Sequence, residues 1–342
     1  MTRLYHKTEN DLTLLDSIDD YRRHFMDIDF WRRYVEAICV RHKLTEAPVI
    51  RTGLAGSYPT FIINDTWVIK LFGRLFEGAM SFETELQVNR LVTAVPEIPA
   101  PELLAEGQLF PASSNWPWPY LILEFVPGVS IGEVYEQVSF AGKLAAAQWM
   151  GQISRQLHDL PTKALSTEIH TAYQRLILHQ HENCADIHRR SAILSEALLE
   201  QLPAYLLPLD DLLDYTPRLI HADFTADHLL GDLSDDGWTS GHIIDFGDTM
   251  VGDIAYELVA LHLDLFRADK RLLTAYLDAY GLDQVARQLL PKRAMTVTLL
   301  HRFDVLEGRY KQFLRTNEVA TLEQLAGLLW DIDTPGLDVL ST

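Results

Sequence analysis

The sequence predicts an α+β fold with two lobes, a small N-terminal lobe built on an antiparallel β-sheet and a larger, mainly helical C-terminal lobe. Short β-branched runs, broken by Gly, Pro and an Asn-Asp turn, occur between residues 47 and 126. The last run meets Pro127-Gly128, a pair that interrupts regular structure. Beyond it, apolar residues recur mostly at helical spacing. We therefore expect the lobes at residues 1–126 and 127–342.

The N-terminal lobe is expected to begin with a helical extension. Residues 10–45 repeat apolar side chains at helical spacing, and Asp27 and Asp29 are the candidate N-caps of the main helix. After this extension the sequence pattern becomes that of β-strands. The elements expected after the extension are strands within 47–73, a helix over 80–92, and strands over 102–110 and 119–126.

The C-terminal lobe is expected to hold helices interrupted by two short β-like pieces. Residues 139–161 predict a helix capped by Ser139, with four apolar residues on one face: Phe140, Leu144, Ile153 and Leu157. The β-like pieces are "PRLIHAD" (217–223) and "GHIIDFGD" (241–248), and long amphipathic segments follow from about 253 to 330. The short pieces carry the residues of chemical interest.

The chain is strongly acidic, with a formal net charge of −19 over 342 residues. This charge argues against nucleic acid or an anionic membrane surface as a partner, because phosphates would be repelled. The imbalance is concentrated in residues 201–342, which hold 23 Asp and Glu against 11 Lys and Arg. Solubility alone accounts for such a surface. A second interpretation is that the C-terminal part attracts a cationic small molecule.

The sequence favours a cytoplasmic, monomeric protein. No apolar run approaches the roughly 18 residues needed to span a bilayer. The start, "MTRLYHKTEN", lacks the apolar core of a signal peptide. The two cysteines, Cys39 and Cys184, lie far apart and form no metal-type pair, which suits a reducing compartment.

One stretch, "HADFTADHLL" at 221–230, places two histidines and two aspartates within eight positions. One interpretation makes His221, Asp223 and His228 the ligands of a hydrolytic metal. The other makes the stretch a phosphotransferase loop in which Asp223 accepts the proton of the attacking hydroxyl. In that second interpretation His221 braces the loop through hydrogen bonds to the backbone.

The order of motifs along the chain favours the phosphotransferase. Such an enzyme needs a cation for the nucleotide phosphates, and Lys70 ends an apolar strand, "WVIK". The next helix carries Glu83 and Glu85, either of which could pair with that lysine. Asp245 follows a second short β-like piece and is a candidate metal ligand. Each feature is weak evidence alone, but together they stand in the order found in kinases.

These elements resemble the aminoglycoside phosphotransferase family, a branch of the protein-kinase-like fold. Its catalytic loop reads approximately His-Gly-Asp-x4-Asn, and its metal-binding segment Ile-Asp-Phe/Trp-x5-Gly-Asp. The corresponding stretches here are "HADFTADH" and "IIDFGDTMVGD". Within the family, the resemblance is closest to the hygromycin B 7''-O-phosphotransferases. It extends to "FW" (30–31), "VIKLFG" (68–73), "WPWPYLI" (116–122), "LHLDLFRADK" (261–270), "LLHRFDVLE" (299–307) and "LLW" (328–330).

The resemblance implies a role for each matching residue. Asp223 would be the catalytic base, Asp245 would ligate Mg²⁺, and Lys70 would hold the α- and β-phosphates of ATP or GTP with Glu85 as its partner. The backbone of Glu124 and Val126 would hold the base of the nucleotide. The loop "AGSYP" (55–59) would cover the phosphates, with Ser57 and Tyr58 nearest, and Asp253 would be a structural helix cap.

One position departs from the family pattern. His228 stands where the family has a metal-binding asparagine. An amide oxygen is the hard ligand that Mg²⁺ prefers, whereas imidazole is softer and suits Zn²⁺ or Mn²⁺. Two alternatives follow: His228 ligates a different ion, or a single Mg²⁺ on Asp245 suffices and His228 binds phosphate. The departure concerns the second metal site. The roles implied for Asp223 and Asp245 do not depend on it.

The acceptor expected from the resemblance is a cationic aminoglycoside, which carboxylates beside the catalytic base would bind. The candidates are Asp227, Asp264, Asp304 and Glu307, and the spacing of the last two predicts one shared helix face. Two rival hypotheses keep the same fold. In one, the acceptor is a macrolide, choline, a sugar or an amino acid. In the other, the protein is a pseudokinase that binds nucleotide and transfers nothing.

Overall fold

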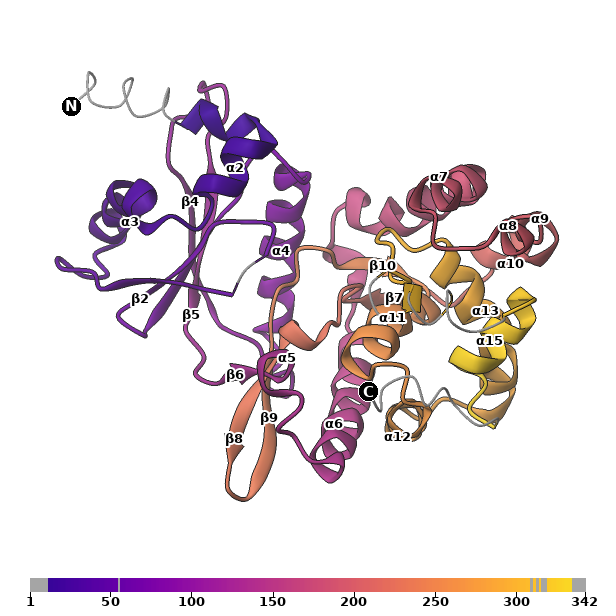
Figure 1. Cartoon of the computed structure of the whole chain (residues 1–342). Helices are drawn as coiled ribbons and strands as arrows, with labels where there is room; N and C mark the ends of the chain where they lie inside the picture. Colours follow the sequence, from indigo (N-terminus) through magenta and orange to yellow (C-terminus); the bar gives the residue numbers. More distant parts are fainter. Residues whose placement is uncertain (1–11, 55, 308–309, 312–313, 315–318, 334–342) are drawn as a thin grey trace. The chain divides into compact units, whose positions relative to one another are not determined.

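The computed structural model describes residues 12–54, 56–307, 310–311, 314 and 319–333 (Figure 1). The first ten residues, in which no signal peptide was found, lie outside these ranges, as does Ala55 of the expected phosphate loop. The α+β class predicted from the sequence is confirmed. The chain divides into two compact units: unit 1 runs to Gly128 and includes His242–Asp248, and unit 2 comprises Val129–Gly241 and the residues from Thr249 onward.

Unit 1 is built on a five-stranded antiparallel sheet with the strand order β1-β2-β3-β5-β4. Its elements are η1 (Thr13–Asp16), α2 (Ile18–His24), α3 (Ile28–His42), β1 (Ile50–Thr52), β2 (Thr60–Ile63), β3 (Trp67–Leu71), α4 (Gly78–Val92), β4 (Leu103–Gln108) and β5 (Pro119–Glu124). Of the two candidate caps, Asp27 begins α3: its side chain accepts hydrogen bonds from the backbone N–H groups of Asp29 and Phe30.

The two faces of this sheet are covered by different helices. On β3, Ile69 and Leu71 point into a core shared with the extension, including Trp31 and Ile38 of α3. The opposite face packs against α4 through Phe82 and Leu86 (Figure 1). Because side chains alternate along a strand, Lys70, between Ile69 and Leu71, is directed to the α4 face.

Unit 2 is mainly helical. Its elements are β6 (Val129–Ser130), α5 (Ile131–Val134), α6 (Phe140–His158), η2 (Thr162–Ala164), α7 (Thr167–Ser191), α8 (Glu196–Leu199), α9 (Leu202–Tyr205), α10 (Leu209–Leu213), β7 (Arg218–Ile220), η3 (Ala226–His228), β8 (Leu229–Ser234), β9 (Gly237–Ile243), β10 (Met250–Gly252), α11 (Ile254–Ala260), the π-helical turn η4 (Leu261–Leu265), α12 (Lys270–Tyr280), α13 (Gln284–Leu299) and α15 (Leu322–Trp330). The last two residues of β9 belong to unit 1. Across the described residues, every helix is too short or too polar to span a bilayer.

The helix α6 packs against α12 and β7 within unit 2. Ser139 caps it as predicted, accepting a hydrogen bond from the Gly142 N–H at 3.1 Å. Phe140 is exposed, however, whereas Ile153 and Leu157 are buried. The helix packs along α12, and a Cβ at Gly151 would lie only 2.4 Å from the Tyr276 carbonyl oxygen. A larger residue at this crossing would therefore separate the two helices.

Unit 2 differs from the expectations in two respects. It contains a β-hairpin that we did not predict, formed by β8 and β9, and Gly237 at the start of β9 adopts φ +112. The expected long helical run also breaks at residues 301–307, which form bends and a turn. Asp304 and Glu307 therefore share no helix face; the Glu307 N–H closes a turn onto the Asp304 carbonyl at 3.0 Å.

Acid should destabilise unit 2 through its buried histidines. Burial lowers the pKa of both His262 and His301 to about 4, so each is neutral when folded and binds a proton on unfolding below about pH 6.5. The stabilisation is thus lost as pH falls from about 6.5 towards 4. Between pH 7 and pH 5 we expect the free energy of unfolding to fall by on the order of 2 kcal/mol for each histidine. Urea unfolding at both pH values would measure it. In a His262→Asn variant the free energy of unfolding should fall less between the two pH values. An equal fall in the variant and in the unaltered protein would contradict the role given to His262.

Candidate active site

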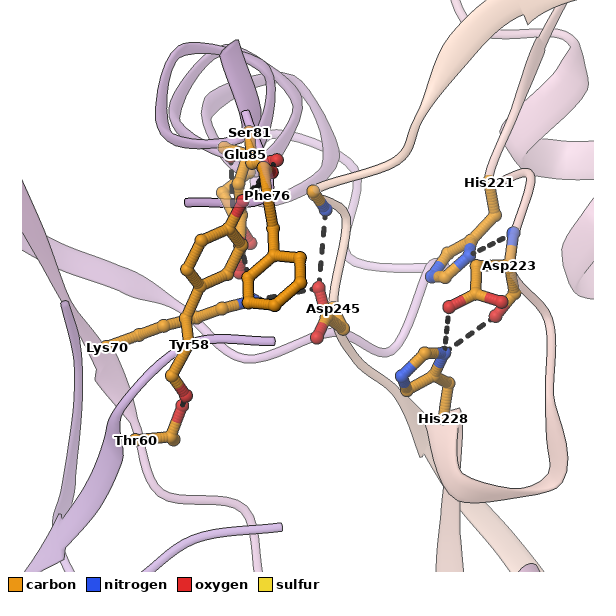
Figure 2. Close-up of polar contacts among 12 residues, drawn as sticks. Tyr58, Thr60, Lys70, Phe76, Ser81, Glu85, His221, Asp223, His228 and Asp245 are labelled. Carbon is orange, nitrogen blue, oxygen red and sulfur yellow. Dashed lines mark hydrogen bonds and ion pairs between the residues drawn. The ribbon is translucent and has the colours of Figure 1, made fainter. Parts of the chain in front are cut away.

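Lys70 lies at the centre of a charged cluster in unit 1 (Figure 2). Its Nζ is 2.7 Å from Glu85 Oε2 and 2.8 Å from Asp245 Oδ1. Lys70 and Glu85 are buried, while the Asp245 side chain is about one third exposed. One ammonium group thus joins two carboxylates that come from α4 and from the segment after β9, 15 and 175 residues away along the chain.

Local sequence patterns position the first two members of this cluster. Strand alternation directs Lys70 to the α4 face, and on α4 the residues Ser81 and Glu85 are one turn apart and both buried. Glu83 lies on the outer side of the helix and is exposed. Of the two glutamates considered from the sequence, the structure therefore places Glu85 at the lysine.

The charge of Lys70 is maintained by its partners. Burial alone would lower the pKa of the ammonium group, but the carboxylates of Asp245 and Glu85 outweigh that effect and raise the pKa above its ordinary value. Lys70 is accordingly a fixed positive charge at neutral pH. A fixed, desolvated cation is suited to holding phosphate oxygens.

Asp245 is held in an unusual backbone conformation. It follows β9, which ends at Ile243, and adopts φ +67, a value that residues other than glycine rarely take. The Ile243 N–H donates to the Pro99 carbonyl at 2.9 Å, which anchors the segment to unit 1. The Gly247 N–H approaches Asp245 Oδ1 at 3.4 Å. Strained residues persist where surrounding contacts fix them, and they cluster at functional sites.

The expected phosphate loop is fastened by tyrosines. The ring of Tyr58 is buried in the apolar cluster on the α4 face, and its hydroxyl hydrogen-bonds with the Phe76 carbonyl and, at 2.9 Å, with Ser81 Oγ. Tyr21 of the helical extension donates its hydroxyl to the Ser57 carbonyl at 2.6 Å. Tyr58 therefore acts here as a support for the loop, and Tyr21 is a contributor that its helical surroundings in the sequence did not reveal.

The expected base-binding segment is the end of β5. The Glu124 N–H donates to the Glu102 carbonyl at 2.9 Å, and the Phe125 N–H donates to the Thr66 carbonyl at 3.0 Å. These two donors are used within the sheet. The backbone groups of this segment that we expect to meet a nucleotide base are therefore the Glu124 carbonyl and the N–H of Val126.

The loop that carries Asp223 lies in unit 2, directly after β7. His221 is fully buried, stacks on Phe224 with ring centroids 4.2 Å apart, and accepts a hydrogen bond from the Asp223 N–H at its Nδ1 (3.3 Å). The brace expected of His221 is thus present. The Asp223 carbonyl accepts from the Thr225 N–H at 2.7 Å, so both backbone groups of Asp223 are held.

His228 supports the same loop through the carbonyl group of Asp223 (Figure 2). Its Nδ1 is 2.6 Å from the Asp223 carbonyl oxygen, 3.2 Å from Thr225 Oγ1 and 3.5 Å from Asp223 Oδ2. An imidazole nitrogen facing these oxygens carries its proton and donates. Any contact of His228 with a metal or a phosphate would consequently be made by Nε2.

A buried carboxylate that we did not predict holds the start of this loop. Glu257 of α11 is fully buried and accepts from the backbone N–H groups of His221 (3.1 Å) and Ala222 (2.6 Å). His158 of α6 lies 3.2 Å from the same carboxylate. Ala222 adopts φ +67, so these bonds stabilise a strained residue next to Asp223. A glutamate in an amphipathic helix normally faces solvent, which is why the sequence did not indicate it.

The four acidic residues expected at the acceptor site differ in their contacts. Asp227 Oδ1 lies 3.4 Å from Ser130 Oγ, and Asp264 Oδ1 accepts from the Ala226 N–H at 2.7 Å. Glu307 is exposed, and its carboxylate is 3.3 Å from Lys311 Nζ. Asp227 thus lies within the Asp223 loop and Asp264 is hydrogen-bonded to that loop, while Asp304 and Glu307 lie on a separate turn.

The described part of the chain offers no ligand cluster for the metal-hydrolase interpretation. Among the residues that the structure describes, no three His, Cys, Asp or Glu side chains are grouped so as to hold a metal ion. His221 Nδ1 and His228 Nδ1 are both engaged with the backbone of Asp223. The histidines of this stretch therefore shape a loop.

Comparison with known proteins agrees with this architecture. An antiparallel sheet with a lysine–glutamate pair, followed by a helical part with a braced aspartate loop, defines a kinase-like fold. The model of the phosphotransferase enzyme family (APH) matches residues 53–294, which is more than half of the chain. The protein therefore belongs to the phosphotransferase enzyme family.

Solved structures with the same fold include aminoglycoside kinases. An APH(2") enzyme in complex with GDP and kanamycin has a TM-score of 0.63 and 20% identity, with 83% of this chain and 95% of that chain covered. Wild-type aminoglycoside 2'-phosphotransferase-IIIa, as its GDP complex, gives a TM-score of 0.62 and 19% identity over 86% of this chain and 97% of that chain. A microcompartment-associated aminopropanol kinase gives a TM-score of 0.51 and 15% identity over 86% and 95% of the two chains.

A curated relative shows that such a sequence also occurs within a larger protein. The lysine-specific demethylase JMJ21 of Arabidopsis thaliana is 22% identical, and the match covers 90% of this chain. The chain spans only 45% of the length of that plant protein.

Proposed function

We propose that this protein is an ATP- or GTP-dependent O-phosphotransferase that modifies a hydroxyl group of a cationic aminoglycoside, hygromycin B being the first candidate. The observation that carries the proposal is the Lys70 ammonium group, which two carboxylates hold at 2.7 and 2.8 Å. A buried cation paired with a helix glutamate is the phosphate-binding device of kinases. Family membership supports the reaction class, and the resemblance to hygromycin B phosphotransferases supports the acceptor.

In this proposal unit 1 binds the nucleotide. The Glu124 carbonyl and the Val126 N–H would hold the base, and Lys70 would hold the α- and β-phosphates. The loop that contains Ser57 would lie over the phosphates, fastened by Tyr21 and Tyr58. Glu85 would keep the lysine in place, and Asp245 would be available to hold a metal ion.

The residues present also suit a magnesium ion. The carboxylate of Asp245 is the hard oxygen ligand that Mg²⁺ prefers. His228 could contribute only Nε2, a softer donor, so we expect Asp245 to be the principal protein ligand. The bound ion would neutralise charge on the phosphates during transfer.

Asp223 would act on the acceptor. Its carboxylate would orient the hydroxyl group and take the proton as the hydroxyl oxygen forms a bond to the γ-phosphorus. The bond from that phosphorus to the oxygen bridging to the β-phosphate breaks, and the nucleoside diphosphate leaves. The braces from His221 and His228 would fix the carboxylate before the substrate arrives, which reduces reorganisation during the reaction.

The acidic residues account for the choice of a cationic acceptor. Aminoglycosides carry several ammonium groups and hydroxyls, and carboxylates bind such cations. Asp304 and Glu307 are our first candidates for acceptor binding, and Asp227, within the Asp223 loop, is a further one. Two buried free cysteines, Cys39 and Cys184, are consistent with action in the reducing cytoplasm.

The test is nucleotide turnover by the purified protein with Mg²⁺, with and without hygromycin B, other aminoglycosides and a macrolide. We expect release of diphosphate that depends on an aminoglycoside. An Asp304→Asn, Glu307→Gln double variant should raise the KM for that acceptor. Turnover only with a neutral acceptor would overturn the aminoglycoside assignment, and nucleotide binding without transfer to any acceptor would indicate a pseudokinase.

A further inference from the structure

The loop that carries Asp223 is held on both sides by carboxylates from one continuous helical segment. Glu257 of α11 accepts from the N–H groups of His221 and Ala222, which precede Asp223. Asp264 of η4 accepts from the N–H of Ala226, which follows it, at 2.7 Å. The two carboxylates are seven residues apart, which places them two turns apart along α11 and η4.

Asp264 takes the place of a side-chain N-cap for the short helix η3. Ala226 begins the short helix η3, and the Thr225 side chain at its N-cap makes no capping hydrogen bond. Thr225 Oγ1 lies instead beside His228 Nδ1 at 3.2 Å. The N–H of Ala226 is therefore satisfied by Asp264, a residue 38 positions away in the sequence.

The π-helical turn that carries Asp264 is itself fixed from outside. His262 Nε2 donates to the Leu329 carbonyl of α15 at 2.8 Å, and Tyr310 donates its hydroxyl to the Leu263 carbonyl at 2.7 Å. A π-helical turn shifts the register of a helix and is frequent at functional sites. Here it presents Asp264 to the loop while the two residues that precede Asp264 are anchored.

We propose that Asp264 is a positioning residue for Asp223, acting by holding the Ala226 N–H and thereby η3 and His228. This inference rests on the proposed phosphotransfer function. It assigns Asp264 a task that needs an oxygen acceptor and no negative charge. An acceptor-binding carboxylate, the role suggested by the sequence, would need the charge.

A pair of substitutions at Asp264 separates the two roles. Asp264→Asn keeps an oxygen for the Ala226 N–H, whereas Asp264→Ala removes it. We expect the alanine variant to lower kcat roughly fivefold to tenfold with an unchanged KM for the acceptor, as for the loss of a helix cap, and the asparagine variant to retain most activity. An increase in acceptor KM in both variants would overturn the proposal in favour of substrate binding.

Asp269 offers a matched control, and hydrogen exchange offers a readout that needs no acceptor. Asp269 caps α12 through the Arg271 N–H at 2.9 Å, so Asp269→Ala removes a comparable cap elsewhere. We expect faster amide exchange in the 221–230 peptide of Asp264→Ala only. Unchanged exchange there would refute the positioning role. If the unaltered protein transfers phosphate to no hydroxyl, the proposed function fails, and the exchange comparison still decides the role of Asp264.

Discussion

Replacing Asp223 with Asn should lower kcat by a factor of about 10²–10⁴ while nucleotide affinity stays unchanged. An amide has nearly the same shape as the carboxylate but cannot take the proton of the attacking hydroxyl, and a lost general base typically costs this factor. The loop should keep its shape, because its principal supports contact the backbone of Asp223: the N–H meets His221 and the carbonyl meets Thr225 and His228. Steady-state transfer and nucleotide titration would measure the two effects.

Asp232 provides the control for this substitution. It lies on β8 in the same unit, is exposed, and makes the same change of charge when replaced with Asn. We expect Asp232→Asn to behave like the unaltered protein in both measurements. If Asp223→Asn turned over as fast as that control, Asp223 would not be the base, and another group would have to orient the hydroxyl.

The sequence predicted those parts of the site that depend on local patterns. The alternation of β3 and the turn spacing of α4 are both short-range, so a pairing of Lys70 with a glutamate of the next helix could be predicted. The loop brace from His221 to Asp223 likewise spans only two residues. In each case the partners are fixed by one element or by two neighbouring elements.

Contacts that depend on the tertiary arrangement could not be predicted in this way. Glu257 is buried because α11 packs against β7. In the sequence, Glu257 stands among apolar residues just as an exposed glutamate of an amphipathic helix does. Tyr21 reaches Ser57 across 36 residues, from a helix whose role in the site no motif indicates. The β8–β9 hairpin did have a local signal that we missed, the Asp-Gly pair between two β-prone runs in "SDDGWT".

Replacing Lys70 with Met should both destabilise unit 1 and weaken productive nucleotide binding. The substitution leaves the buried Glu85 and the partly exposed Asp245 without their shared cation, and breaking a buried ion pair by removing one partner typically costs about 3–5 kcal/mol. Loss of the charge that holds the α- and β-phosphates should lower kcat/KM for the nucleotide by about 10²–10³. Urea unfolding and nucleotide turnover would measure the two losses separately.

A second substitution distinguishes the structural loss from the functional one. In the Lys70→Met, Glu85→Gln double variant no buried carboxylate is left unpaired, so we expect most of the stability to return while turnover stays lost.

Because the pKa of Lys70 is raised by its partners, its contribution to the stability of unit 1 is present at all pH values below about 10.4 and is lost only above. The stability difference should therefore be the same at pH 7 and pH 9. Lys163→Met, an exposed lysine outside the cluster, should change neither quantity. If the double variant recovered turnover together with stability, Lys70 would be a structural residue and the nucleotide phosphates would need another cation.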